Sequence, residues 1–287
     1  MKMKNVKKIL GVFLTFILMI GVFAGCGSAS STNSNVASGS LEEIKQRGVV
    51  KIGVFSDKPP FGYVDANGEN QGFDVYIGKR IAKDLLGDEN KVEFVLVEAA
   101  SRVEFLQSNK VDIILANFTV TPERKEAVDF ANPYMKVALG VVSKDGAITS
   151  IDQLKGQTVV VNKGTTADSY LTKNYPDINL LKFDQNTETF EALKDGRGVA
   201  LAHDNTLLFA WARENAGYKV GVSSLGDQDT IAPAVKKGNT ELLNWINDDL
   251  KKLGKENFMK EAYDATLLPA YGDSIKAEDV IIEGGQQ

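Results

Sequence analysis

The sequence predicts an α/β fold divided into two lobes. Short runs rich in β-branched residues alternate with amphipathic stretches of helical period, as in open parallel sheets covered by helices on both faces. The alternation occupies residues 49–143 and restarts near residue 150, so two such units are expected. With 43% hydrophobic and 25% charged residues over 287 positions, the composition is that of a soluble globular protein, long enough for a large core or two smaller ones.

The first residues have the pattern of an export signal. A basic segment, 2–8, precedes an apolar run, 9–24, that ends in the small residues Ala24 and Gly25. The run is short for a membrane span, which takes roughly 20 apolar residues. We therefore predict that residues 1–25 are a signal peptide and that the remainder is exported. An uncleaved signal anchor is the alternative.

Cys26 follows this signal directly and is the only cysteine of the chain, so no internal disulfide can form. The segment Phe23-Ala24-Gly25-Cys26 resembles a bacterial lipobox, which implies a lipid on the Cys26 thiol. A cysteine placed there by chance is the alternative. Residues 27–39 are small or polar and uncharged, the composition of a flexible linker. We predict a lipid-anchored tether over 26–42 that holds the folded protein at the outer face of the cell membrane or in the periplasm.

In the first half of the chain, apolar periodicity predicts helices and strands in alternation. Apolar residues recur every four positions from Phe73 to Leu85, on one face of a helix over 73–86. Gly87 follows at the position of a C-cap glycine. The other expected elements are a helix over 101–109 and strands over 49–54, 92–97, 111–116 and 137–143.

The second half repeats this alternation. Asn239 and Thr240 supply the start of a late helix over 239–253, and residues from Trp245 to Leu253 supply its apolar face. The other expected elements are strands over 158–161 and 199–203, and helices over 150–154 (closed by Gly156), from about 166, over 186–195, over 205–214 and over 256–265.

Polar residues that follow strands are the candidate site residues, because ligands of open α/β sheets bind beyond the carboxyl ends of the strands. Thr119 and Arg124 follow the strand over 111–116. Arg124 can bind a planar carboxylate through two parallel hydrogen bonds, and Thr119 can add a third. A helix start with a surface arginine explains the same pattern.

Two further polar segments follow strands in the second half. Asn162-Lys163-Gly164-Thr165-Thr166 leads into a helix whose free N–H groups attract anions, although an ordinary turn also fits. Asp204 precedes the helix over 205–214 and can either hold an ammonium group or cap that helix. Together, an anion site and a carboxylate match the two ends of a free α-amino acid.

Other classes of site lack the residues they need. His203 is the single histidine and Cys26 the single cysteine, and these two alone cannot build a zinc site. No serine lies in a Gly-x-Ser-x-Gly elbow, and no phosphate-binding loop has the required spacing. The net charge of −5 argues against a nucleic-acid partner. We expect no cofactor and no metal.

Several motifs resemble those of bacterial extracellular solute-binding proteins that deliver polar amino acids to ABC transporters. They are Gly72-Phe73-Asp74-Val75, Lys110-Val111-Asp112, Thr121-Pro122-Glu123-Arg124, Val128-Asp129-Phe130, Pro133-Tyr134, Lys163-Gly164-Thr165-Thr166 and His203-Asp204. The resemblance implies the type II periplasmic-binding-protein fold, with the ligand in the interlobe cleft. It implies a lobe 1 over 43–134 and 231–287, a lobe 2 over 139–225, and crossover hinges near 134–138 and 226–230.

The resemblance also implies roles for single residues. Arg124 would clamp the ligand carboxylate, helped by Thr119 and the N–H of Thr166. Asp204 would pair with the ligand ammonium, with the Asn117 carbonyl nearby. The expected ligand-binding set is completed by Phe55, Lys58, Arg102, Phe118, Tyr134, Lys163 and His203.

Some positions depart from relatives that bind glutamine or basic amino acids. Phe55 and Lys58 stand where many of those carry an aspartate and an aromatic residue, and Arg102 lies in a stretch where they place another aromatic. The added positive charge counts against lysine or arginine as the ligand. The segments that most resemble cysteine-binding members are 58–63, 97–106, 134–141 and 204–211. Cysteine is therefore the first expected ligand, aspartate or glutamate the second, and cystine the third.

The resemblance implies a monomer that closes over its ligand and then docks on an ABC transporter permease. Its contact with the membrane would be the lipid anchor alone, and we expect no enzyme activity. Two other classes share this fold, namely sensors or adhesins without transport and enzymes such as cyclohexadienyl dehydratases. A dehydratase needs a general acid close to a leaving group, whereas Asp204 is assigned to an ammonium group.

Overall fold

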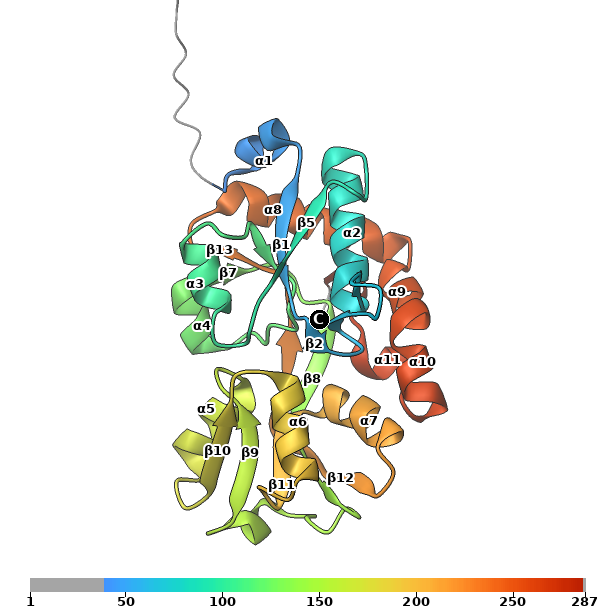
Figure 1. Ribbon diagram of the computed structural model, residues 1–287. Coiled ribbons are helices and arrows are strands. Elements are labelled where there is room, and N and C mark those ends of the chain that lie inside the picture. Colours follow the sequence, from blue (N-terminus) through green and yellow to red (C-terminus); the bar gives the residue numbers. More distant parts are fainter. Residues whose placement is uncertain (1–38, 286–287) are drawn as a thin grey trace, which may run out of the picture. The chain divides into compact units, whose positions relative to one another are not determined.

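The computed structural model describes residues 39–285. The predicted signal peptide over 1–25, Cys26 and most of the predicted tether lie outside the described residues. Within the described residues, no helix is both long and apolar enough to cross a membrane. Two five-stranded sheets with helices packed around them form the α/β architecture that the sequence predicts (Figure 1).

The first sheet has the strand order β5-β1-β6-β13-β7. Its strands are β1 (Val50–Val54), β5 (Val92–Leu96), β6 (Ile113–Ile114), β7 (Val128–Phe130) and β13 (Ala234–Lys236). β1 pairs in parallel with β5 and β6, whereas β13 runs antiparallel to β6 and β7. The predicted parallel pairing is present in β1, β5 and β6, and β13 adds an antiparallel strand because the chain returns to this sheet directly from β12 (Tyr218–Ile231) of the second sheet, without a crossover helix.

The helix predicted over 73–86 is present with those bounds. Gly87 ends it in the left-handed conformation, at a φ of 81°, with its N–H on the Lys83 carbonyl. The helices of this lobe are α1 (Leu41–Arg47), α2 (Phe73–Leu86), α3 (Arg102–Gln107), α4 (Pro122–Ala127), α8 (Thr240–Lys255), α9 (Phe258–Thr266), α10 (Leu268–Tyr271) and α11 (Ala277–Val280). A small sheet after β1 contains β2 (Asp57–Lys58), β3 (Gly62–Val64) and β4 (Asn70–Gln71).

The second sheet has the strand order β10-β9-β11-β8-β12. Its strands are β8 (Met135–Lys144), β9 (Thr158–Asn162), β10 (Asn179–Phe183), β11 (Ala200–Asp204) and β12 (Tyr218–Ile231), and its helices are α5 (Thr166–Asn174), α6 (Asn186–Lys194), α7 (Asn205–Glu214) and the 3-10 turn η1 (Ile151–Leu154). β9 is parallel to β10 and β11, whereas β8 is antiparallel to β11 and β12. β12 escaped the sequence prediction because its glycines and charged residues are held in a strand by pairing with β8, through three shifts of register.

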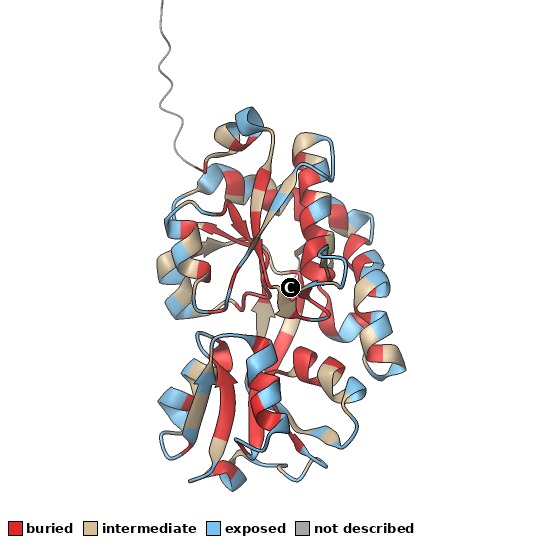
Figure 2. Cartoon of the chain, in the orientation of Figure 1, coloured by how far each residue is buried: buried red, intermediate tan, exposed pale blue. Residues whose placement is uncertain are grey.

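Most buried residues lie on the strands and on the helix faces turned toward them (Figure 2), and the buried hydrophobic residues form the core. One core cluster extends from Ile44 in α1 through β1, α2 and the C-terminal helices to Leu207 in α7. Arg213 of α7 also donates to the Pro269 carbonyl at 2.7 Å. The two lobes therefore contact each other through α7 and α10 as well as through the strands that join them.

The sheets are connected by β8 and β12, which pair with each other along most of their length (Figure 1). The paired ends bring Met135 opposite Ile231. The segments predicted as hinges, 134–138 and 226–230, lie at this end of the ribbon. Bending at these segments stays a prediction.

Candidate functional site

A buried ion pair joins the two lobes beyond the carboxyl ends of β1 and β11. Lys58, on β2, donates from Nζ to Asp204 Oδ2 at 2.8 Å and to Asn117 Oδ1 at 2.6 Å. The side chains of Lys58 and Asp204 are only 2% and 5% exposed. The rings of Phe55 and Phe61 lie under the ammonium, with centroids at 5.2 and 5.8 Å, within the range of cation–π attraction.

Burial and the partner's charge shift the pKa of each member of this pair in opposite directions. Burial lowers the pKa of Lys58, and the Asp204 carboxylate offsets part of that effect. Burial also opposes ionisation of Asp204, but the Lys58 ammonium and then His203 outweigh it and hold the pKa of Asp204 far below its usual range. Asp204 is therefore ionised at neutral pH, and the loss of either partner would leave a buried charge without compensation.

Asp204 is the last residue of β11 and stands directly before α7. Its side chain makes no capping hydrogen bond to that helix, so the capping alternative is wrong. Its Oδ1 lies 3.5 Å from the hydroxyl of Thr166, the first residue of α5. His203 is buried, and its Nδ1 accepts the backbone N–H of Asp204 at 2.7 Å. Asp204 thus has one oxygen on Lys58 and one oxygen that is only weakly engaged.

Arg124 lies in the first turn of α4, where Thr121 caps the helix by accepting the Arg124 N–H at 3.2 Å. Its guanidinium donates to the Thr119 carbonyl at 2.7 Å and, across the lobes, to the Gly164 carbonyl at 2.9 Å. A guanidinium has five N–H donors, so donors remain for a ligand once these two described partners are satisfied. Burial lowers the pKa of Arg124 to about 10, and the group stays charged at neutral pH.

Arg102 is buried at the start of α3 and uses its donors on backbone carbonyls. Its Nε donates to Ala99 at 2.9 Å, and its terminal nitrogens donate to Ala116 at 2.9 Å, to Asn117 at 3.3 Å and to Gly164 at 3.3 Å. Burial lowers its pKa well below the usual range. Arg102 therefore connects loops of both lobes through its hydrogen bonds. Its direct contact with a ligand stays a prediction.

Phe118 supports both arginines. Its ring centroid lies 4.3 Å from the guanidinium carbon of Arg102 and 4.7 Å from that of Arg124. The ring is buried, so cation–π attraction helps to hold two like charges close together. The structure thus brings Phe118 to the cluster, as the resemblance implies.

Asp74 is a buried carboxyl that was not among the predicted site residues. Its Oδ1 accepts the Tyr134 hydroxyl at 2.6 Å, and its Oδ2 accepts the Asn117 N–H at 2.8 Å. Burial raises the pKa of Asp74 to about 6 in spite of these hydrogen bonds. Asp74 thus holds Asn117, at a φ of 45°, in the left-handed region that asparagine tolerates. The available signal was an acidic residue three positions before Ile77, on the apolar face of α2.

The turn over 162–166 contributes its backbone to the cluster. The Lys163 ammonium donates to Asp184 Oδ2 at 2.8 Å, on the exposed side of the lobe. Gly164 instead approaches the first lobe so closely that a Cβ there would lie 2.6 Å from Ala100 Cα. The ligand-binding role predicted for Lys163 has no support in this geometry, because its side chain is engaged elsewhere.

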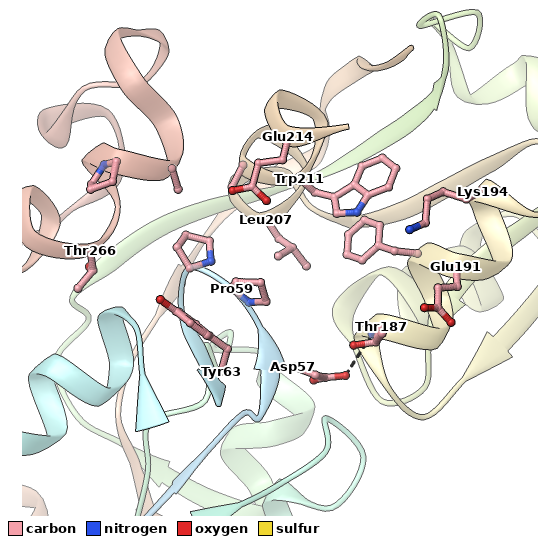
Figure 3. A pocket seen from close by; sticks show the side chains of 15 residues that line it. Asp57, Pro59, Tyr63, Thr187, Glu191, Lys194, Leu207, Trp211, Glu214 and Thr266 are labelled. Carbon is pink, nitrogen blue, oxygen red and sulfur yellow. Dashed lines mark hydrogen bonds between the residues drawn. The ribbon is translucent and has the colours of Figure 1, made fainter. Parts of the chain in front are cut away.

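Asp57, the other residue of β2, makes a second crossing between the lobes. Its carboxylate accepts Asn186 Nδ2 at 2.9 Å at the start of α6. It also accepts the Thr187 N–H at 3.1 Å (Figure 3). Neighbouring residues of a strand point to opposite faces, so Asp57 and Lys58 reach different parts of the second lobe. Asp57 also borders a hollow of about 370 Å³ whose far wall includes Trp211.

A separate hollow of about 560 Å³ lies beside Arg124. It is lined by the starts of α4 and α5, including Thr166, and by Asp229 of β12. This volume is within the usual range of small-molecule sites. Across residues 39–285, no three side chains of the metal-binding types lie close enough to hold a metal ion.

Comparison with known proteins identifies the family. Residues 50–267 match the model of the bacterial extracellular solute-binding proteins, family 3. The ABC transporter glutamine-binding protein GlnH of Bacillus subtilis is 36% identical over 263 residues, which cover 90% of this chain and 96% of that protein. The glutamine-binding protein of Geobacillus stearothermophilus is 38% identical over 234 residues, or 77% of this chain and 89% of that protein.

Solved structures give the same result at higher identity. A solute receptor for L-cysteine of Neisseria gonorrhoeae is 64% identical with a TM-score of 0.84, over 85% of this chain and 100% of that chain. The cysteine-binding protein from Campylobacter jejuni has the same identity and TM-score, over 85% of this chain and 98% of that chain. The chain therefore belongs to the bacterial extracellular solute-binding proteins of family 3.

Proposed function

We propose that this chain captures free L-cysteine outside the cytoplasm and delivers it to the permease of an ABC transporter. Two proteins 64% identical to it are named as a receptor for L-cysteine and a cysteine-binding protein. The observation that carries the function is the cluster of Arg124, Lys58 and Asp204, which combines groups for a carboxylate and for an ammonium from both lobes. A ligand that touches both lobes favours their closed arrangement.

The ligand carboxylate would lie on the remaining donors of Arg124, beside Thr119. The N–H of Thr166 at the start of α5 would add a further donor, because the N-terminus of a helix attracts anions. The ligand ammonium would lie on Oδ1 of Asp204, near Asn117. In this arrangement the charged partner of the ligand carboxylate, Arg124, comes from the first lobe, and that of the ammonium, Asp204, comes from the second.

We infer that the protein works at the outer face of the cell membrane. The family is one of extracellular proteins, and the Cys26 thiol would carry the lipid that anchors the tether over 26–42. We propose a monomer whose lobes, 43–134 with 231–287 and 139–225, close about the segments 134–138 and 226–230. The family's role is binding for transport, so we propose neither a sensory role nor catalysis.

Aspartate and glutamate are the second candidate ligands, and cystine is the third. The observation that favours an acidic side chain is the positive charge that Lys58 and Arg102 bring to the buried cluster. The dehydratase alternative has a distant counterpart, an ancestral amino acid-binding protein described as a precursor of cyclohexadienyl dehydratase, at 34% identity and a TM-score of 0.72. Of the two buried carboxyls of the cluster, Asp74 has the raised pKa, and it faces Tyr134 and Asn117. We therefore expect a bound amino acid to be recovered unchanged.

Thermal unfolding of the purified protein against twenty free amino acids and cystine tests the function. A ligand that binds only the folded form raises the melting temperature. We expect the largest rise with L-cysteine under reducing conditions. A rise with aspartate and glutamate alone would reassign the ligand, and no rise with any compound, on protein freed of carried-over ligand, would refute amino-acid binding.

Replacement of the carboxylate clamp gives a sharper test. Arg124→Ala should weaken cysteine binding by about 2–5 kcal/mol, because the ligand carboxylate loses its main charged partner. Arg197→Ala is the matched control, since that exposed arginine packs on Phe183 within the second lobe, outside the cluster. Titration calorimetry measures both variants, and an Arg124→Ala affinity within about threefold of the wild type would sink the assignment.

A further inference from the structure

The side-chain end of the proposed ligand position is rich in positive charge. Lys58 and Arg102 are buried there, with Asp204 and Asp74 as the buried carboxyls. The ligand ammonium adds another cation beside Asp204, so three positive charges face two negative ones. The ligand carboxylate does not change this balance, because it lies at the other end, on Arg124. Since an uncompensated charge is strongly disfavoured in a buried site, the side-chain end favours an anion.

Lys58 has the donor to bind that anion. An ammonium has three N–H donors, and in Lys58 two of them are used by Asn117 Oδ1 and Asp204 Oδ2. Within residues 39–285 the third has no hydrogen-bond partner. Oδ1 of Asp204 has only a long contact, at 3.5 Å, with the hydroxyl of Thr166, so the ligand ammonium can bind there without displacing Lys58. In cysteine the ammonium nitrogen and the sulfur are separated by two carbons alone, so a ligand whose ammonium lies on Asp204 Oδ1 can bring its sulfur close to Lys58 Nζ.

We propose that Lys58 selects the ligand by its side chain and binds the cysteine sulfur as a thiolate. The inference rests on the proposed function and adds the charge state of the ligand. Free cysteine is mostly a thiol at neutral pH, because the pKa of a free cysteine thiol is about 8.5. Binding therefore breaks the S–H bond, leaves the electron pair on sulfur and passes one proton to the buffer. No oxidant or reductant takes part.

The groups around Lys58 allow this step to be measured at neutral pH. From β11 it faces Asp204, which stays ionised, and His203, whose pKa burial lowers and which is therefore neutral. From α2 it faces Asp74, whose pKa of about 6 lies below the range of the thiol, and from α3 it faces Arg102. The other neighbours, Asn117, Phe55 and Phe61, do not titrate. Above about pH 6.5, Asp74 is mostly ionised, so the thiol and Lys58 itself are the neighbouring groups whose charge changes most.

The ultraviolet absorbance of thiolate reports the proposed state directly. Purified protein is mixed with L-cysteine at pH 7 under reducing conditions, and the spectra of protein alone and of cysteine alone are subtracted. We expect a thiolate band that saturates at one equivalent of ligand. The apparent affinity should rise about tenfold from pH 6.5 to 7.5 and level off above the thiol pKa of about 8.5.

Calorimetry in buffers of different ionisation enthalpy supplies the second readout. Cysteine should release about one proton per molecule bound at pH 7, whereas serine should release none and bind at least about 100-fold more weakly. Serine is the matched ligand because it has oxygen in place of the cysteine sulfur, and its side-chain hydroxyl does not ionise near neutral pH. A proton released equally by serine would come from the protein, and would overturn the inference.

Two lysine variants connect the effect to Lys58. Lys58→Met should weaken cysteine binding, abolish the thiolate band and remove the pH dependence. Lys155→Met, which removes an exposed lysine paired with Asp177, should behave as the wild type. If Lys58→Met fails to fold, the thiolate absorbance and the proton release of the wild-type protein still test the inference. Cysteine that binds without a band and without proton release would overturn the thiolate while leaving the proposed function intact, whereas no cysteine binding at all would refute both.

Discussion

The first lobe brings cationic side chains to the cleft, whereas the second lobe brings the Asp204 carboxylate and the carbonyl of Gly164. Lys58, Arg102 and Arg124 all belong to the first lobe, and each of them reaches one of those two second-lobe groups. The cations stay close together because Phe118 and backbone carbonyls of their own lobe support them. The difference teaches that neither lobe supplies the charged partners of both ends of an amino acid, so tight binding requires both lobes.

The two lobes nevertheless present their site residues in the same way. In each lobe the parallel strands end at the cleft, with β1 and β6 in the first lobe and β9 and β11 in the second. In the second lobe those strands lead directly into α5 and α7. Parallel strands collect their carboxyl ends at one edge of the sheet, and this explains why segments far apart in the sequence supply one site.

Removal of the Asp204 carboxylate from the second lobe should reduce cysteine affinity more than any other change considered below. Asp204→Ala leaves Lys58 without its charged partner and the ligand ammonium without its acceptor. Breaking one side of a buried pair costs about 3–5 kcal/mol, so we expect cysteine affinity to fall by more than about 100-fold in calorimetry. Asp184→Ala, which removes the exposed carboxylate on Lys163, is the control. An affinity that survives within a few-fold would show that the second lobe binds the ligand in another way.

The two buried carboxyls should respond to pH in opposite directions. Asp74 keeps its proton in the folded protein up to a pKa of about 6, against 3.8 as its reference. The folded state therefore binds more protons between about pH 4 and 6, and this group removes about 3 kcal/mol of stability as pH rises through that window. Asp204 has a lowered pKa, so its contribution is present above about pH 4 and is lost below it.

Urea unfolding between pH 3.5 and 7.5 separates these two contributions. The difference between wild type and Asp74→Asn should fall with rising pH over the window from 4 to 6 and stay flat above it. The difference between wild type and Asp204→Asn should instead change below pH 4. A wild-type minus Asp74→Asn difference that does not vary between pH 4 and 6 would contradict the raised pKa.

A methyl group where Gly164 of the second lobe approaches Ala100 of the first should have an intermediate effect on ligand affinity. Gly164→Ala places a Cβ 2.6 Å from Ala100 Cα, so the lobes cannot meet as they do here, and cysteine affinity should fall by about 2 kcal/mol in calorimetry. Gly156→Ala is the matched control, because its φ of 73° nearly equals the 72° of Gly164 while its Cβ meets nothing within 4 Å. Both substitutions carry the strain of a left-handed alanine. Equal losses of affinity in Gly164→Ala and Gly156→Ala would mean that backbone strain alone causes the effect.

Removal of the hydrogen bonds that Asp57 makes between the lobes should have the smallest effect on cysteine affinity. Asp57→Ala removes two hydrogen bonds to the start of α6, and each is worth about 1 kcal/mol. Water can replace them when the lobes separate, so we expect affinity to fall by only about threefold to tenfold. Asp88→Ala, which removes two hydrogen bonds to Asn90 within the first lobe, should leave affinity unchanged. A similar loss in both variants would mean that the crossing does not contribute to closure.

The sequence by itself determined the elements that short-range forces govern. Apolar period, the glycine C-cap and the N-cap residue are local, and they predicted α2 over 73–86 and α7 over 205–214 with the bounds that the structure has. The same local reasoning found the turns that carry Arg124 and Thr166, because polar residues after strands mark the ligand side of an α/β sheet. It also found Asp204, while leaving open whether that residue caps a helix or binds an ammonium.

Tertiary structure decided what depends on contacts between distant segments. β12 is a strand because β8 lies beside it, and Asp74 belongs to the site because Tyr134 and Asn117 fold against it. The Lys58–Asp204 pair joins residues 146 positions apart, and no local pattern records such a partner. Charge and burial act through space rather than along the chain, so the folded structure alone sets the pairing, the pKa values and the charge that the ligand side chain meets.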